Sequence, residues 1–75
     1  MTQEEIKAAC ERVDKGEQVQ VFHKIKGKGQ IVSYRSDKLS NNRIKANINY
    51  IIPDLLEDVI KPEFSFLDDE NISLQ

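Results

Sequence analysis

Length and composition bound what this chain can be. It has 75 residues, of which 39% are apolar and 32% charged, and its formal net charge is −2. A domain of this size buries only about 60% of the surface that its unfolded chain exposes, so we expect one thin-cored domain without a buried active site. No apolar run approaches the roughly 20 residues that cross a bilayer, and the N-terminal residues lack the pattern of a signal peptide. The lone Cys10 excludes an internal disulfide, and we expect a cytoplasmic protein that holds neither a metal nor a cofactor.

A helix is predicted first, over residues 3–15. Thr2 and Glu5 have the spacing of a capping box, in which each side chain binds the backbone N–H of the other residue. Gly16 stands where a residue in the left-handed conformation ends a helix. Between them runs one apolar stripe with helical spacing, formed by Ile6, Ala9, Cys10 and Val13. We therefore expect a helix that packs by a single face.

Three strands are predicted next. Apolar and polar residues alternate from Val19 to Ile25, which is typical of a half-buried strand, and predict a hairpin of strands at about 19–26 and 30–35 with Gly27 and Gly29 in its turn. The polar segment 35–43 is expected to be a surface loop. The strictest alternation, over residues 44–52, predicts a strand whose core face carries Ile44, Ala46, Ile48, Tyr50 and Ile52.

The C-terminal third is less regular. Pro53 ends the third strand, and Asp54 and Glu57 repeat the capping-box spacing, so we predict a short helix over about 54–60, with a further strand as the alternative. Residues 63–67 alternate and predict the last strand, and residues 68–75 are expected to fray. This order of elements predicts an α+β fold: a small antiparallel sheet with an N-terminal helix and a short helix or turn before the last strand.

The predicted hairpin resembles a known family. Its residues Val21-x-His23-x-x-Lys26-Gly27-x-Gly29-x-Ile31 are similar to the V-x-H-x-x-F-G-x-G-x-V pattern of small SH3-like, Tudor-type barrels, with Lys26 where the family usually has an aromatic. The similarity covers residues 16–34. Such barrels form the C-terminal domain of UvrD-type helicases, and related ones form the RNA-polymerase-interacting domains of CarD-like regulators and transcription-repair coupling factors. The resemblance implies an SH3-like, partly open barrel that binds a protein partner, such as RNA polymerase or another nucleic-acid machine.

The chain offers little material for catalysis. His23 and Cys10 are the only candidates for a base and a nucleophile, and neither has a partner visible in the sequence. We interpret His23 as a packed imidazole and Cys10 as a small buried hydrophobe. The acidic runs lack the spacing of a calcium loop, and the glycines of the hairpin fit no nucleotide-binding loop. We predict no catalytic, cofactor-binding or metal-binding residues.

The charges are segregated along the chain. Residues 1–20 carry three cations and five anions, residues 21–45 seven cations and one anion, and residues 46–75 one cation and seven anions, so the net charges are −2, +6 and −6. Lys24, Lys26 and Lys28 are expected to share one face of the hairpin. Either the cations form an exposed binding surface, or the acidic C-terminal third folds over them and neutralises them.

We therefore expect a non-enzymatic binding module. The basic hairpin and the loop after it would bind another protein; the alternative is that the same surface binds RNA or single-stranded DNA. A third possibility is a small phage- or plasmid-type accessory protein that inhibits a host machine. With so small a core, the chain could be a monomer or a homodimer. The candidate binding residues are Phe22, Lys24, Lys26, Lys28, Tyr34, Arg35, Lys38, Arg43 and Lys45.

Overall fold

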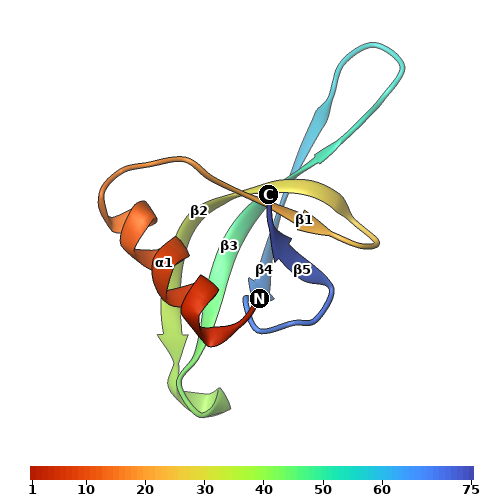
Figure 1. The fold of residues 1–75 in the computed structure, drawn as a ribbon. Coiled ribbons are helices and arrows are strands. Elements are labelled where there is room, and N and C mark those ends of the chain that lie inside the picture. Colours follow the sequence, from red (N-terminus) through yellow and green to blue (C-terminus); the bar gives the residue numbers. More distant parts are fainter.

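The computed structural model describes residues 1–75 as one N-terminal helix and a five-stranded antiparallel sheet (Figure 1). The strands lie in the order β4-β3-β2-β1-β5, so each strand pairs with the next one in the chain, except that β5 returns to pair with β1. This is the predicted α+β class, and the open sheet is compatible with a small partly open barrel. No helix is long and apolar enough to cross a membrane. The elements are α1 (Gln3–Asp14), β1 (Val19–His23), β2 (Gly27–Asp37), the 3-10 helix η1 (Lys38–Ser40), β3 (Arg43–Ile52), β4 (Val59–Phe66) and β5 (Ile72–Leu74).

The helix α1 begins and ends as its sequence predicts. The backbone N–H of Thr2 donates to Glu5 Oε1 (2.9 Å), and the N–H of Glu5 donates to Thr2 Oγ1 (3.2 Å), which completes the capping box. The hydrogen bond from the Thr2 backbone N–H is the main cause of the lowered pKa of the Glu5 carboxyl. Gly16 follows the last turn with φ +82°, the left-handed conformation expected there.

The hairpin between β1 and β2 turns earlier than the glycines predict. β1 ends at His23 and β2 already begins at Gly27, so the turn is Lys24–Lys26 rather than the Gly27–Gly29 segment. His23 Nδ1 accepts hydrogen bonds from the backbone N–H groups of Ile25 and Lys26, both at 3.1 Å. Gly27 closes the turn with φ +86°. The histidine ring therefore accepts the hydrogen bonds of two backbone N–H groups in the turn. The alternation of apolar and polar residues does not reveal this role.

The loop predicted over 35–43 is shorter than expected. β2 continues to Asp37, which pairs with Arg43, and only η1 and two residues separate β2 from β3. Asn41 and Asn42 make this tight connection with φ of 56° and 59°. Arg35 therefore lies within β2 and not in a loop.

β2 also contains an irregularity. A register shift between Ile31 and Ser33 marks a β-bulge, which leaves Val32 exposed on the sheet.

The short helix predicted over 54–60 is wrong. Val59 and Ile60 begin β4, where they pair with Ile52 and Ile51, and residues 54–58 form the bend of a long β3–β4 hairpin. The alternative of a strand is correct for its last two residues. Asp54 accepts from the N–H of Leu55 at 2.7 Å, so its side chain stabilises a turn and not a helix start.

The tail predicted to fray also proves to be ordered. Ile72–Leu74 forms β5, which pairs with Val21–His23 of β1 and inserts Ile72 into the core. Asp69 shapes the preceding loop by accepting from the N–H of Asn71 at 2.9 Å. The backbone nitrogen of Met1 donates to carbonyls of Leu67 and Ile72, which ties both ends of the chain together. A strand of three residues, only two of them apolar, is too short to stand out in a sequence.

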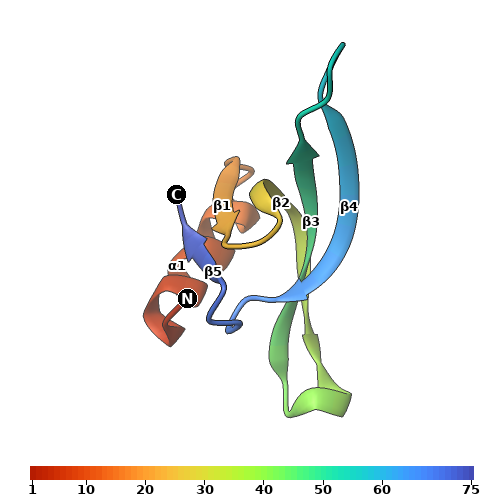
Figure 2. The ribbon, with the colours of Figure 1, turned by 90° about the vertical axis from the view of Figure 1, so that its right-hand side faces the viewer.

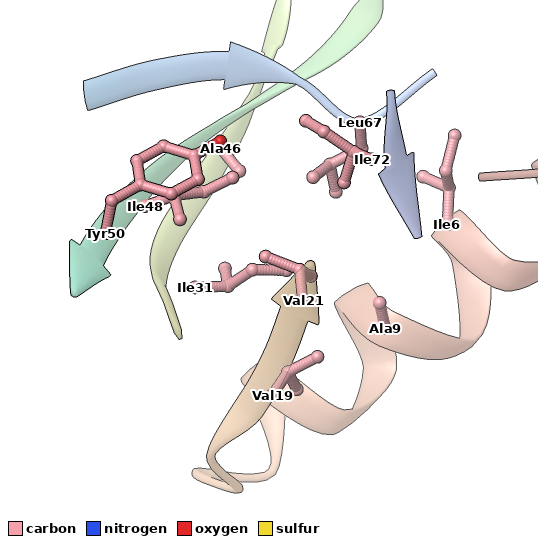
Figure 3. Close-up of a cluster of buried hydrophobic side chains, with 10 residues drawn as sticks. All are labelled: Ile6, Ala9, Val19, Val21, Ile31, Ala46, Ile48, Tyr50, Leu67 and Ile72. Carbon is pink, nitrogen blue, oxygen red and sulfur yellow. The ribbon is translucent and has the colours of Figure 1, made fainter. Parts of the chain in front are cut away.

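A single core lies between α1 and the inner face of the curved sheet (Figure 3). The predicted core face of β3 is correct for Ala46, Ile48 and Tyr50, which are buried, whereas Ile52 lies beyond the core and is 40% exposed. Figure 2 shows α1, β1 and β5 on one side of the molecule and β3 with β4 on the other, with the β3–β4 hairpin projecting past the rest. The core consists of Ile6, Ala9, Val19, Val21, Ile31, Ala46, Ile48, Tyr50, Leu67 and Ile72.

Candidate functional site

The outer face of the sheet is the side opposite the core. Along β3 the buried residues alternate with Lys45, Asn47 and Asn49, so these three side chains point outward. α1 packs on the inner face through Ile6 and Ala9, and no other element covers the outer one. The fold therefore leaves the outer face of the sheet open.

Aromatic and cationic side chains gather on this outer face. Phe64 pairs with Asn47 and Phe66 with Lys45, while Arg35 pairs with Lys45 from the other side. We call this set the outer patch; its members are Arg35, Arg43, Lys45, Asn47, Phe64 and Phe66. Phe64 is 61% exposed, which is unusual for a ring in the middle of a strand. Its exposure makes it the most accessible aromatic side chain of the chain's three phenylalanines and two tyrosines.

Each cation of the outer patch lies near a ring. The guanidinium of Arg43 lies 3.9 Å from the Phe66 centroid, and the Lys45 Nζ lies 5.3 Å from it. Around Phe64, the Arg35 guanidinium is at 6.0 Å and the Lys45 Nζ at 5.9 Å. Phe66 is thus covered by Arg43, whereas Phe64 is flanked by two cations and leaves its ring open to solvent.

Acidic residues neutralise part of this patch. Arg43 donates two hydrogen bonds to Asp68, Nε to Oδ2 at 2.8 Å and Nη2 to Oδ1 at 2.6 Å. These bonds lower the pKa of Asp68 and raise that of Arg43. Lys45 lies 3.9 Å from Asp37, at the limit of an ion pair. Arg35 forms no ion pair, so it is the free cation beside Phe64.

The remaining predicted residues do not join this patch. Lys24 and Lys26 lie in the β1–β2 turn, and Lys28 lies in β2 opposite Phe22, so the three lysines do not form the predicted row. Lys26 Nζ instead pairs with Glu63 at 3.2 Å and lies 5.3 Å from the Tyr50 centroid. The predicted basic hairpin and basic loop are at opposite ends of β2, and Lys38 lies in η1. They form no single surface.

Tyr34 is turned away from the outer face. It pairs with Ala46 on the core side, and its hydroxyl donates to Asp14 at 2.8 Å, which connects β2 to the end of α1. This hydrogen bond is the main reason that the pKa of Tyr34 is raised to about 12. Tyr34 is therefore an anchor for the helix.

His23 and Cys10, the two residues considered for catalysis, both contribute to the fold. His23 is buried, holds the turn and meets Tyr50 edge-on at 6.0 Å between centroids. Cys10 is half-buried against the core, and burial, with Asp14 nearby, raises the pKa of its thiol. No three His, Cys, Asp or Glu side chains lie close enough together to hold a metal ion.

Sequence reasoning did not include Phe64, Phe66 or Asn47 among the candidate binding residues, although it placed Asn47 on the face opposite the core. The alternation over residues 63–67 predicts only a strand that closes the sheet, because either set of alternating side chains could face the core. The pairing of Ser65 with Ala46, and the buried hydrogen bond of 3.1 Å between Ser65 Oγ and Tyr50 Oη, put the serine inside and both rings outside. One signal was available in the sequence. Tyr50 lies on the predicted core face of its strand, and a buried tyrosine hydroxyl needs a hydrogen-bond partner, which favours an inward-facing polar residue such as Ser65.

Comparison with protein families, with curated proteins and with solved structures finds no match.

Proposed function

We propose that this chain is a non-enzymatic module that binds single-stranded nucleic acid on the outer face of its sheet. The observation that carries the proposal is Phe64, whose ring is 61% exposed between Arg35 and Lys45. Proteins that bind single strands combine such an open ring, on which a base stacks, with cations that meet the backbone phosphates. The outer patch offers both within one pair of strands.

Polar neighbours of Phe64 support this proposal. Asn47 lies directly opposite Phe64, and Gln30 pairs with Asn49 one position further along the same face. Amide side chains both donate and accept hydrogen bonds, which suits the edges of unpaired bases. No carboxylate of these strands points outward between Gln30 and Arg35 or between Lys45 and Asn49. The centre of the face therefore does not repel a polyanion.

The acidic composition of the chain is compatible with this binding. Glu4, Glu5 and Glu11 belong to α1, which packs against the inner face. Glu57 lies at the end of the β3–β4 hairpin. Because charges in salt solution are screened beyond about 10 Å, the local charge around Phe64 matters more than the net charge of −2.

A protein partner is the second candidate for the same surface. Exposed aromatics and arginines are also the side chains that dominate protein interfaces, so Arg35 and Phe64 suit an acidic protein surface as well. The SH3-like resemblance of the hairpin favours such a partner, for example a nucleic-acid machine, and an inhibitor of host machinery would use the patch in the same way. We rank this candidate second because the amides of Asn47, Asn49 and Gln30, on the same face as the open ring of Phe64, suit unpaired bases.

Titration of a fluorescent single-stranded oligonucleotide tests the proposal. Phe64→Ala should weaken binding by about 1–3 kcal/mol, roughly 5- to 150-fold, because one base loses its stacking surface. Phe64→Leu should weaken binding nearly as much, since it keeps apolar contact but removes the ring. Arg35→Ala should weaken binding less and lower the slope of log affinity against log salt by about 1.

Lys7→Ala is the control, because it removes one exposed cation from α1, on the other side of the molecule. It should leave both affinity and salt slope unchanged. If the wild-type protein does not bind DNA or RNA oligonucleotides at low salt, the proposal is wrong. The outer patch would then belong to the protein-binding candidate.

A further inference from the structure

The β3–β4 hairpin extends past the core as an arm, residues 51–60, that nothing covers (Figure 2). Its bend carries Leu55 and Leu56, each 98% exposed, between Asp54 and Glu57. The two strands that lead to the bend carry apolar side chains on both faces. Three of these side chains are about half exposed: Ile52, Val59 and Ile60. A two-stranded ribbon alone is marginally stable in water, so this arm has the composition of a segment that docks.

A hollow of about 370 Å³ lies at the root of the arm. Its apolar lining is Phe22, Ile51 and Pro53, and the charged residues Lys26, Lys28 and Asp58 also line it. Lys24 lies in the adjoining turn, and neither Lys24 nor Lys28 forms an ion pair within the molecule. The hollow is thus apolar in part; because Lys26 is paired with Glu63, its unpaired cations are Lys28 in the lining and Lys24 in the adjoining turn, against one lining carboxylate, Asp58.

The bend and the hollow are complementary in chemistry. The segment Asp54-Leu55-Leu56-Glu57 offers two apolar side chains between two carboxylates, and the hollow offers an apolar floor beneath lysines. The bend cannot fill its own hollow, because Pro53 and Asp58 line the hollow while residues 54–57 project away from it. Another molecule of the same chain carries a segment with the required chemistry.

We propose that two copies form a dimer in which the bend of each arm occupies the hollow of the other. A two-fold axis makes such an exchange reciprocal, since the patch that donates and the patch that receives are both present on each copy. The contact buries the exposed leucines and brings carboxylates to unpaired lysines.

This dimer is independent of nucleic-acid binding. The hollow lies beside Ile51, at the arm end of the outer face, whereas Phe64 pairs with Asn47 and Arg43 lies at the opposite end of β3. None of the six residues of the outer patch belongs to the bend or lines the hollow. Loss of one property therefore does not imply loss of the other.

Sedimentation equilibrium of the full chain measures the dimer. Leu55→Ala and Leu56→Ala together should raise the dissociation constant by about tenfold or more, because two buried leucine side chains are lost. Leu39→Ala is the matched control, since Leu39 is 99% exposed in η1, away from the arm, and should leave the constant unchanged. A wild-type chain that stays monomeric up to about 1 mM overturns the proposal, as does a dimer that is insensitive to both leucines.

A charge exchange tests the arrangement. One variant carries Asp54→Lys and Glu57→Lys at the bend, and the other carries Lys24→Glu and Lys28→Glu at the hollow. Each variant alone should be a weaker dimer than the wild type, because like charges then face each other at both contacts, and an equimolar mixture should dimerise again. All four side chains are exposed, so circular dichroism should show both variants folded. A mixture that stays monomeric overturns the reciprocal arrangement.

Discussion

The two glycines of the β1–β2 hairpin are needed for different physical reasons. Gly27 adopts φ +86°, a conformation that other residues reach only with strain, and has open space around its α-carbon. Gly29 lies inside β2, where it pairs with Tyr50, and a methyl group there would come within 2.6 Å of Ile48 Cγ2 and 3.0 Å of the Tyr50 ring. The sequence shows two glycines in a turn; the structure shows one in the turn and one beneath a buried ring.

Replacing Gly29 by alanine should therefore destabilise the fold by about 1–3 kcal/mol, as overpacking of a core does. Urea denaturation followed by circular dichroism measures this loss. In an Ile48→Ala background, which removes the closest contact, the same replacement should cost less. Equal costs in both backgrounds would show that the clash with Ile48 is not the cause.

The Tyr34 hydroxyl reports whether α1 is held to the sheet. Its hydrogen bond to Asp14 raises the pKa of Tyr34 to about 12 from an ordinary value of 10.0. Since the folded state holds the phenolic proton more tightly than the unfolded state, this contribution to stability is complete below pH 10 or so and is lost as pH rises through about 12. At neutral pH it is fully present.

We predict that Asp14→Ala lowers the pKa of Tyr34 toward 10.0, because the main cause of the upward shift is removed. Spectrophotometric titration of tyrosinate measures the change, and Tyr34→Phe identifies which transition belongs to this residue. An unaltered titration in Asp14→Ala would contradict the hydrogen bond.

At the scale of elements, the β1–β2 turn explains the pattern that resembles SH3-like barrels. His23 binds the N–H groups of Ile25 and Lys26, Gly27 supplies the positive φ, and Gly29 makes room for Tyr50. The spacing of histidine and glycines is thus the requirement of one tight hairpin over a buried tyrosine. Where the family pattern has an aromatic, Lys26 places its ammonium 5.3 Å from the Tyr50 centroid.

We predict that His23→Ala destabilises the protein by roughly 2–3 kcal/mol, because two N–H groups lose their acceptor and a buried ring is removed. His23→Asn should recover part of this loss, since an asparagine carbonyl accepts from N–H groups two residues on. Hydrogen exchange of the Ile25 and Lys26 amides should accelerate in His23→Ala and much less in His23→Asn. If both amides exchange as in the wild type, His23 does not hold the turn.

The errors among the predicted elements share a cause. A capping-box spacing at Asp54 and Glu57 is a local signal, but pairing of Val59 and Ile60 with β3 outweighs it once the chain has turned at Pro53. The three residues of β5 form a strand only because β1 offers an unpaired edge beside the core. The amphipathic helix and the ten-residue β3 were predictable because their own periodicity is long enough to select one face.

Across the whole molecule, the basic segment 21–45 is neutralised in part and left unpaired in part. Of the seven cations in residues 21–45, three meet carboxylates: Lys26 with Glu63, Arg43 with Asp68 and Lys45 with Asp37. The acidic C-terminal third supplies two of those partners, so it covers part of the basic segment. Exposed ion pairs contribute little to stability, about 0–1 kcal/mol each. Their effect here is to leave Arg35 as the free cation beside Phe64.

The sequence by itself determined the fold class, the helix with both of its ends, and the core face of β3, because each depends on residues close together in the chain. It also identified Arg35, Arg43 and Lys45 as candidates for binding. Tertiary structure alone decided which side of β4 faces outward, since a strand's period of two leaves both faces equivalent until a register is chosen. The buried hydrogen bond between Tyr50 and Ser65, with the pairing of Ser65 and Ala46, accompanies that choice, and the same register brings Phe64 to the surface between two cations.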